Sequence, residues 1–144
     1  MKISTRGRYA IRVMIDLAEH RKDGYIPLKE IAERQEIPFK YVEAIMTSLS
    51  KEGLVEGKHG KTGGYRLVRE SNKYKVSEIL IITEGDLAPV TCLGCEINNC
   101  PRNEKCKTLP MWKNLYSLIK DYFESITLSD LVGSNETFLL GNGI

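Results

Sequence analysis

Three stretches of apolar residues with helical spacing follow one another within residues 5–50, and the interruptions between them are short. In the first stretch, residues 5–20, apolar side chains recur at the i, i+4 spacing of one helix face. Gly24 ends this helix, and Pro27 and Pro38 suit the first turns of a second and a third helix. The second and third helices are joined by a turn of only a few residues before Pro38, and this arrangement predicts a helix-turn-helix. The rest of the chain must then pack around this motif.

The third predicted helix has two faces of different character. Its apolar face comprises Tyr41, Val42, Ile45, Met46 and Leu49. The second helix of such a pair lies in the major groove of DNA, with its N-terminal residues at the base edges. The candidates for this contact are Phe39, Lys40, Tyr41, Glu43, Ala44 and Thr47. Glu43 would act through specificity, because a carboxylate repels phosphate but accepts a hydrogen bond from cytosine N4. The alternative is a solvated helix face without a ligand.

A glycine-rich hairpin is predicted after the third helix. Residues 54–56 and 65–68 have strand character, and residues 57–64 connect them. Glycines allow a tight turn that brings backbone N-H groups near a phosphate. Cations add affinity for DNA, and this affinity falls as the salt concentration rises. The predicted DNA contacts in this wing are Lys58, His59, Gly60 and Lys61. A flexible hairpin tip without a ligand is the alternative.

The charge of the chain is divided unevenly along its length. Residues 1–75 carry 16 Lys and Arg against 10 Asp and Glu, whereas residues 76–144 carry 5 against 9. A basic first half suits a polyanionic partner. The longest apolar run is too short to span a bilayer, and no signal peptide is apparent, so we expect a cytoplasmic protein without a membrane partner. With two histidines and no nucleophile set beside a base, we expect neither an enzyme nor a small-molecule substrate.

All four cysteines of the chain lie within fifteen residues, with the spacing Cys92-x2-Cys95-x4-Cys100-x5-Cys106. Disulfide frameworks are disfavoured in a cytosolic chain, which leaves metal or redox chemistry. Structural zinc sites prefer two paired knuckles, and only the first pair here qualifies. Iron-sulfur clusters accept looser spacings of soft thiolate ligands, so they are the favoured interpretation. Zinc, a thiol switch and the absence of any ligand remain alternatives.

A long amphipathic helix is predicted after Pro110. The residues Trp112, Leu115, Ile119, Tyr122 and Ile126 are spaced 3, 4, 3, 4 as in a coiled-coil seam, and Tyr116 and Phe123 form a second row. We therefore predict a homodimer through Trp112, Leu115, Ile119, Tyr122, Phe123 and Ile126. The alternative is a helix that completes the core of a monomer. Thr127 and Asp130 form a predicted capping box that begins one more short helix.

The expected fold is mainly α with a small β-wing, of the α+β class. It comprises a winged helix-turn-helix domain over residues 1–83, a cysteine-rich cluster-binding loop over residues 84–107, a dimerisation helix with a short C-terminal helix over residues 108–132, and a mobile tail over residues 133–144. A twofold dimer would place two recognition helices on a palindromic operator in double-stranded DNA.

Several segments of the chain resemble the Rrf family of winged-helix transcriptional regulators, and in particular its iron-sulfur cluster regulators. These segments are MKISTRGRYAIRVMIDLA, IPFKYVEAIMTSLSKEGLV, KHGKTGGYRL, the cysteine loop and ITLSDLV. The resemblance covers nearly all of residues 1–132. It implies a homodimer, sequence-specific DNA binding by the third helix and the wing, and a cluster held before the dimerisation helix.

The resemblance also implies a set of cluster ligands. By position the three cysteine ligands of those regulators fall on Cys92, Cys100 and Cys106, whereas Leu109 replaces the histidine that completes their two-iron cluster. Cys95 is the first candidate for the fourth ligand. A side chain from the partner's first helix is the second, although Arg8 stands near where related nitric-oxide sensors carry an acidic ligand. A 2Fe-2S cluster is favoured, with 4Fe-4S as the alternative.

Two functions of the same general class follow from these patterns. The first is a repressor or dual regulator whose DNA binding depends on an iron-sulfur cluster that senses cluster supply, redox or nitrosative state. By the resemblance, Glu43 occupies the position that makes DNA choice depend on cluster occupancy. The second is a cluster-free winged-helix regulator whose signal is a thiol switch, zinc or a partner enzyme.

Overall fold

The computed structural model describes residues 2–133 and has the predicted mainly helical architecture with a small β-hairpin. The α-helices are α1 (Thr5–Glu19), α2 (Leu28–Gln35), α3 (Phe39–Lys51), α4 (Val76–Glu84), α5 (Leu109–Ser125) and α6 (Leu128–Val132). The strands are β1 (Val55–Lys58) and β2 (Gly64–Leu67). Short 3-10 turns occupy Arg21–Asp23, Ser71–Lys73, Thr91–Leu93 and Asn103–Lys105. Apart from Gly133, the expected mobile tail lies outside the described residues.

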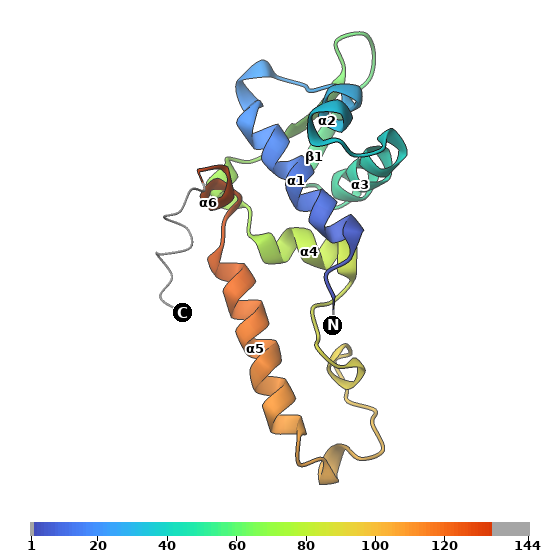
Figure 1. Cartoon of the computed structure of the whole chain (residues 1–144), viewed down its shortest axis with the longest axis vertical. Coiled ribbons are helices and arrows are strands. Elements are labelled where there is room, and N and C mark those ends of the chain that lie inside the picture. Colours follow the sequence, from blue (N-terminus) through green and yellow to red (C-terminus); the bar gives the residue numbers. More distant parts are fainter. Residues whose placement is uncertain (1, 134–144) are drawn as a thin grey trace.

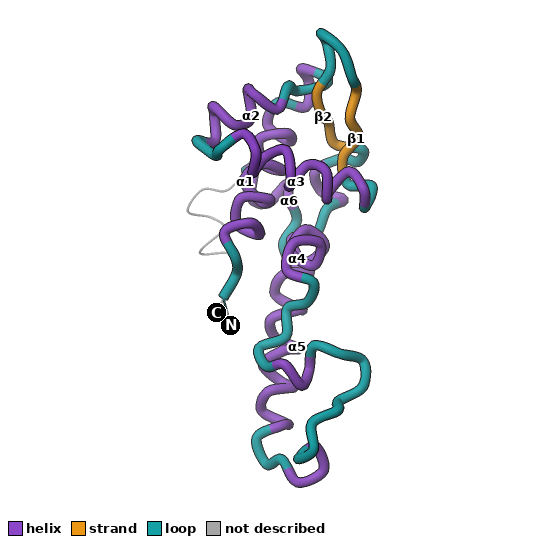
Figure 2. The backbone as a smooth tube through the Cα atoms, turned by 90° about the vertical axis from the view of Figure 1, so that its right-hand side faces the viewer, coloured by secondary structure: helices purple, strands orange, loops and turns teal. Residues whose placement is uncertain are grey.

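The molecule is elongated, with the helix-turn-helix and hairpin at one end and the cysteine loop at the other (Figures 1 and 2). Residues 85–108 lead away from the bundle after α4, and helix α5 returns alongside them toward α6. The core is built mainly from α1, α2, α3 and the roots of the hairpin. Helix α6 contacts α1, and its Leu128 is fully buried in that core. The last described helix therefore packs on the helix-turn-helix half of the molecule.

The turn between α2 and α3 is held by backbone geometry and a buried side chain. Glu36 adopts a left-handed conformation with φ 53°, and its amide donates to carbonyl oxygens at the end of α2. Ile37, which follows, is 3% exposed and anchors the turn in the core. Pro38 then precedes the first residue of α3, as its fixed φ allows. The predicted helix-turn-helix is thus present with the expected brief connection.

The apolar face predicted for α3 is confirmed at four of its five positions. Val42, Ile45, Met46 and Leu49 are fully buried. Tyr41 is wrong as a core residue, because 49% of its surface is exposed and its ring packs edge-on against Tyr9. It lies at the margin of the apolar stripe, where a phenol can keep its hydroxyl in water.

A buried carboxylate joins α1 to α2. Asp16 is 0% exposed, and its two oxygens accept hydrogen bonds from Arg34 Nε at 3.0 Å and Nη2 at 2.8 Å. The side-chain amide of Gln35 donates a third bond at 3.0 Å. This hydrogen bonding raises the pKa of Arg34, chiefly through its contact with Asp16. A buried charge is tolerated when it is paired and hydrogen-bonded in this way.

The root of the hairpin is fixed by a buried tyrosine that the sequence reading did not single out. Tyr74 is 0% exposed, and its hydroxyl donates to the Leu54 carbonyl at 2.6 Å. The same oxygen accepts from the amides of Val68 at 3.0 Å and Arg69 at 3.1 Å. One side chain therefore satisfies three backbone groups next to the two strands, at the open end of the hairpin.

Helix α5 packs on its own chain through part of the set that was predicted to contact a second chain. Ile119 and Phe123 contact a small core that also contains Val76 and Leu80 of α4. Ile126, which was predicted to lie in the dimer seam, follows the helix and is 4% exposed within its own chain, and its carbonyl accepts from the amide of Val76. The end of the helix turns into its own core, because α6 must return to α1. The predicted capping box is confirmed, with Thr127 and Asp130 bonding each other's backbone amides.

Candidate nucleic-acid interface and cysteine loop

The outer face of α3 displays every side chain that was predicted to contact bases. All six are exposed to solvent: Phe39, Lys40, Tyr41, Glu43, Ala44 and Thr47. Thr47 uses its hydroxyl to bond the Glu43 carbonyl within the helix, at 2.9 Å. Phe39 is 46% exposed at the start of α3, although exposing a phenyl ring to water is unfavourable. An exposed aromatic residue beside polar ones suits contact with a base edge or a thymine methyl group.

Helix α1 contributes cations beside α3, which the sequence reading missed. The Arg12 guanidinium lies over the Tyr9 ring, 5.4 Å from its centroid, and Tyr9 in turn packs at 5.8 Å against Tyr41. Arg12 also donates to the carbonyl of Gln35, and Arg6 donates to the hydroxyl of Ser48 on α3. These contacts hold two positive charges along the margin of α3. Their partners lie far along the sequence, so no local pattern indicates them.

The wing is a tight antiparallel hairpin whose tip carries the predicted contacts. Lys58, at the end of β1, and the loop residues His59, Gly60 and Lys61 are all exposed. Gly60 adopts φ 104°, and a Cβ at Gly63 would lie 2.1 Å from the Lys58 carbonyl oxygen. Glycine is therefore required for the turn, as the sequence pattern indicated. The tip therefore offers cations and backbone amides, which are groups that bind phosphate oxygens.

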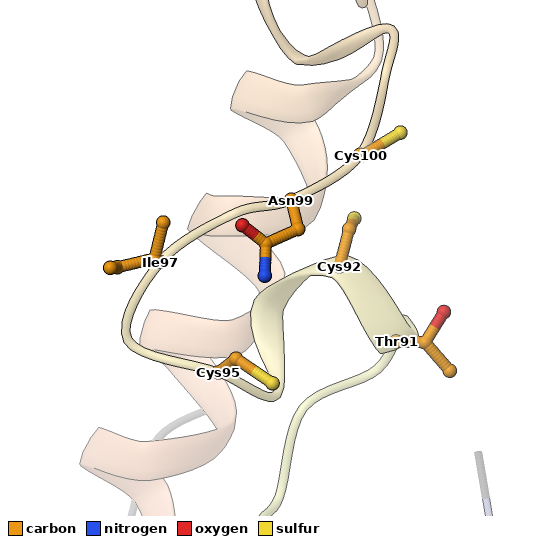
Figure 3. A pocket seen from close by; sticks show the side chains of 6 residues that line it. All are labelled: Thr91, Cys92, Cys95, Ile97, Asn99 and Cys100. Carbon is orange, nitrogen blue, oxygen red and sulfur yellow. The ribbon is translucent and has the colours of Figure 1, made fainter.

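The cysteine loop, residues 85–108, brings three of the four thiols to one pocket. This open pocket of about 310 Å³ is lined by Thr91, Cys92, Cys95, Ile97, Asn99 and Cys100 (Figure 3). Cys92 and Cys100 lie at one end of it, and Cys95 lies at the other. The amide of Cys100 donates to Asn98 at 2.9 Å, and Asn98 donates to Asn103 at 2.9 Å. Asparagine side chains thus shape the loop around the thiols.

Cys106 stands apart from that pocket, at the start of α5. Its Sγ lies 3.4 Å from the Thr108 hydroxyl, and its carbonyl accepts from the first amide of the helix. The side-chain hydrogen bond from Thr108, followed by the backbone amide of Thr108, lowers the pKa of the Cys106 thiol. A thiolate near a helix N-terminus is a competent metal ligand. Leu109, which replaces the expected histidine ligand, is 8% exposed and apolar.

The donor set fits an iron-sulfur cluster in its chemistry, since four thiols in one loop are the soft ligands that such clusters bind. The thiols are not gathered at ligand spacing, because nowhere in residues 2–133 do three Cys, His, Asp or Glu side chains form a group that could hold a metal ion. Cys95 shares a pocket with Cys92 and Cys100, which supports it as the candidate fourth ligand. Cys106 would have to approach the other three.

A row of apolar side chains on α5 faces solvent. Met111, Leu115, Leu118 and Tyr122 are 38–66% exposed and are spaced 4, 3, 4 along one helix face. Leu115 and Tyr122 belong to the predicted seam, whereas Met111 and Leu118 were missed. Trp112 is half-buried. The helix is therefore apolar on both its inner and its outer face.

A helix-turn-helix followed by a basic hairpin defines the molecule as a winged-helix protein. The family model described as Rrf2, an iron-dependent transcriptional regulator, matches residues 3–134. The chain belongs to this family of transcriptional regulators. No α-helix in the described part of the chain is long and apolar enough to cross a membrane.

Three similar proteins place the chain within the family. The HTH-type transcriptional regulator IscR of Pectobacterium atrosepticum is 35% identical over 136 residues, which are 94% of this chain and 82% of that protein. The structure of T. potens IscR is 35% identical, with a TM-score of 0.73 over 92% of this chain and 86% of that one. CymR, described as the global cysteine regulator of B. subtilis, is 30% identical, with a TM-score of 0.74 over 92% and 96%. These relatives are named as regulators and not as enzymes, in agreement with the sequence-based expectation.

Proposed function

We propose that the chain is a cytoplasmic homodimer that binds a palindromic operator through α3 and the wing, and that an iron-sulfur cluster in residues 85–108 controls this binding. The observation that carries the proposal is the exposure, on one winged helix, of a polar recognition face and a cationic hairpin tip. The likeness to regulators named IscR supports the cluster. The cluster would be 2Fe-2S by preference, and the protein a repressor or dual regulator.

When bound, the cluster would supply a redox-sensitive and oxygen-sensitive link between Cys92, Cys100 and Cys106, with Cys95 as the candidate fourth ligand. Helix α4 connects this loop to the helix-turn-helix, because it precedes the loop in the chain and contacts α1 and α3. The loop begins directly after Glu84, the last residue of α4.

The contact between Glu84 and the start of α1 is close. Its Oε1 accepts from the amide of Ser4 at 3.1 Å and from the hydroxyl at 2.6 Å, and Ser4 is the N-cap of α1. A Cβ at Gly7 would lie 2.2 Å from the same oxygen, so a larger residue there would displace the Glu84 carboxylate. Helix α4 also contacts α3 directly. A change in the order of the loop can therefore bias the placement of α1 and α3.

The exposed row Met111, Leu115, Leu118 and Tyr122 is the surface that a second chain would cover. Dimerisation through Leu115 and Tyr122 retains two residues of the predicted seam, while Ile119 and Phe123 support the helix from the inner side. A twofold axis would then present two α3 helices to successive major-groove turns.

Lys61 at the wing tip is expected to contribute a phosphate contact. In Lys61→Ala, the slope of log affinity against log salt should become shallower by about 0.9, because one fewer counterion is released on binding. The measurement is a salt titration with DNA from upstream of the protein's own gene. Lys113→Ala, an exposed lysine on α5, is the control and should keep the wild-type slope. Equal slopes in all three proteins would remove the wing tip from the interface.

A second candidate function is a cluster-free regulator that uses its thiols directly. The lowered pKa of the Cys106 thiol favours it, because the thiolate is the reactive form of cysteine. This candidate predicts DNA binding that responds to peroxide in protein free of metal and returns on reduction with a dithiol. The cluster-dependent function predicts that metal-free protein binds alike in both states.

A further inference from the structure

Tyr25 is built into the wing although it precedes α2 in the sequence. The next residue, Ile26, exchanges two backbone hydrogen bonds with Tyr65 of β2, both at 2.8 Å. Ile26 is buried in the core. Because successive side chains of an extended segment point to opposite sides, the side chain of Tyr25 lies on the outer side of the hairpin. A Cβ at Gly64 would lie 2.2 Å from the Ile26 carbonyl oxygen, which shows how closely the segments approach. Tyr25 is half-buried there.

Two cations from different strands lie over the ring of Tyr25. Lys58 Nζ is 5.6 Å from the ring centroid, and Arg66 Cζ is 4.4 Å from it. The strand register pairs Arg66 with Glu56 and Lys58 with Gly64, so both cations belong to the outer face of the hairpin. Val55 and Leu67, on the inner face, are buried. The aromatic ring is thus a shared platform that holds two positive charges on one surface.

Glu56 is the one anion in this group, which we call the Tyr25 cluster: Tyr25, Glu56, Lys58 and Arg66. It accepts from Arg66 Nε, and it lies 3.5 Å from the Tyr25 hydroxyl. The hydrogen bond that Arg66 donates to Glu56 raises the pKa of Arg66. Both side chains of the pair are more than 40% exposed. An exposed ion pair is weak in water, so Arg66 can turn to an incoming phosphate without a large penalty.

We propose that the outer face of the wing is a second DNA-backbone contact, in which Arg66 and Lys58 bind phosphate and Tyr25 is the residue that positions them. The surface is continuous with the cationic tip through Lys58, and two cations against one carboxylate leave it positive. Guanidinium groups match the geometry of phosphate oxygens. The inference rests on the proposed function, since it requires that the chain binds DNA.

The first test removes the cation with the least effect on the fold. Arg66→Met should reduce the log-log salt slope for the DNA upstream of the protein's own gene by about 0.9, with Lys113→Met as the matched control. If wild-type protein shows no salt-dependent DNA binding, the proposed function itself fails. If wild-type protein binds and Arg66→Met behaves like Lys113→Met, only the outer-face contact fails.

The second test separates positioning from folding. Tyr25→Leu should weaken DNA binding about three- to tenfold, because both cations lose their platform, whereas Tyr25→Phe keeps the ring and should bind within about twofold of wild type. Thermal unfolding followed by circular dichroism checks that Tyr25→Leu is folded at the assay temperature. In Tyr25→Leu with Arg66→Met, the losses should be less than multiplicative. Equal weakening by Leu and Phe, or full multiplicativity, would overturn the positioning role.

Discussion

Replacing Asp16 with alanine is expected to destabilise the protein by about 3 kcal/mol, a large part of the stability of a domain this size. Three hydrogen bonds from Arg34 and Gln35 disappear together, and two of them join charged groups. Arg34 is one-third exposed, so water can partly solvate its guanidinium in the variant. The loss of stability therefore stays below that expected for a fully buried unpaired charge. Urea unfolding measured by circular dichroism gives the change in free energy.

The chain contains a matched control for this prediction. Glu30 is bonded to the same Arg34 at 3.4 Å, but its side chain is 55% exposed. Glu30→Ala should therefore change the free energy of unfolding by less than about 1 kcal/mol. Similar losses in the two variants would mean that burial of Asp16 does not strengthen its contacts with α2.

Alanine at Cys92, Cys100 or Cys106 is expected to abolish the visible absorption of the protein. Protein purified without oxygen should be brown, because thiolate-to-iron charge transfer gives an iron-sulfur cluster its colour. Loss of any one of these three ligands should leave too few thiolates to retain the cluster. The measurement is the absorption spectrum together with iron, sulfide and zinc analysis of each variant. A colourless wild-type protein with stoichiometric zinc would contradict the cluster.

Cys95→Ala distinguishes the candidates for the fourth ligand. If Cys95 is that ligand, the variant should lose the cluster or show a shifted spectrum, whereas Thr91→Ala, which lines the same pocket without a thiol, should keep the wild-type spectrum. A brown Cys95→Ala protein with an unchanged spectrum would assign the fourth position to another residue.

Local patterns in the sequence were sufficient for most of the secondary structure. Helical apolar spacing, the prolines before α2 and α3, and the Thr127 capping box each depend on residues within a few positions of one another. The same is true of the glycine-rich turn at Gly60. These features are determined by short-range sterics and hydrogen bonds, so they are readable before the fold is known.

Contacts between distant segments were not readable in this way. The sequence predicted a seam and a second apolar row on α5, but it did not show that the chain's own core covers Ile119, Phe123 and Ile126. This depends on how α4 packs against the helix. The platform role of Tyr25 depends on strand pairing across about forty residues. In the cysteine loop, the sequence spacing identified the four thiols. It did not show that three of them share a pocket while Cys106 lies outside it, because this depends on how the loop folds.

We expect an iron-sulfur cluster to change how tightly this winged helix binds its DNA. The most direct test is an anaerobic gel-shift titration of cluster-loaded and cluster-free protein on the promoter of its own gene, with one salt concentration throughout. A regulatory coupling of ordinary size predicts that the two forms differ in affinity by at least about fivefold. Identical affinities in the two forms, each with salt-dependent binding, would contradict control by the cluster and leave a DNA-binding protein with another signal.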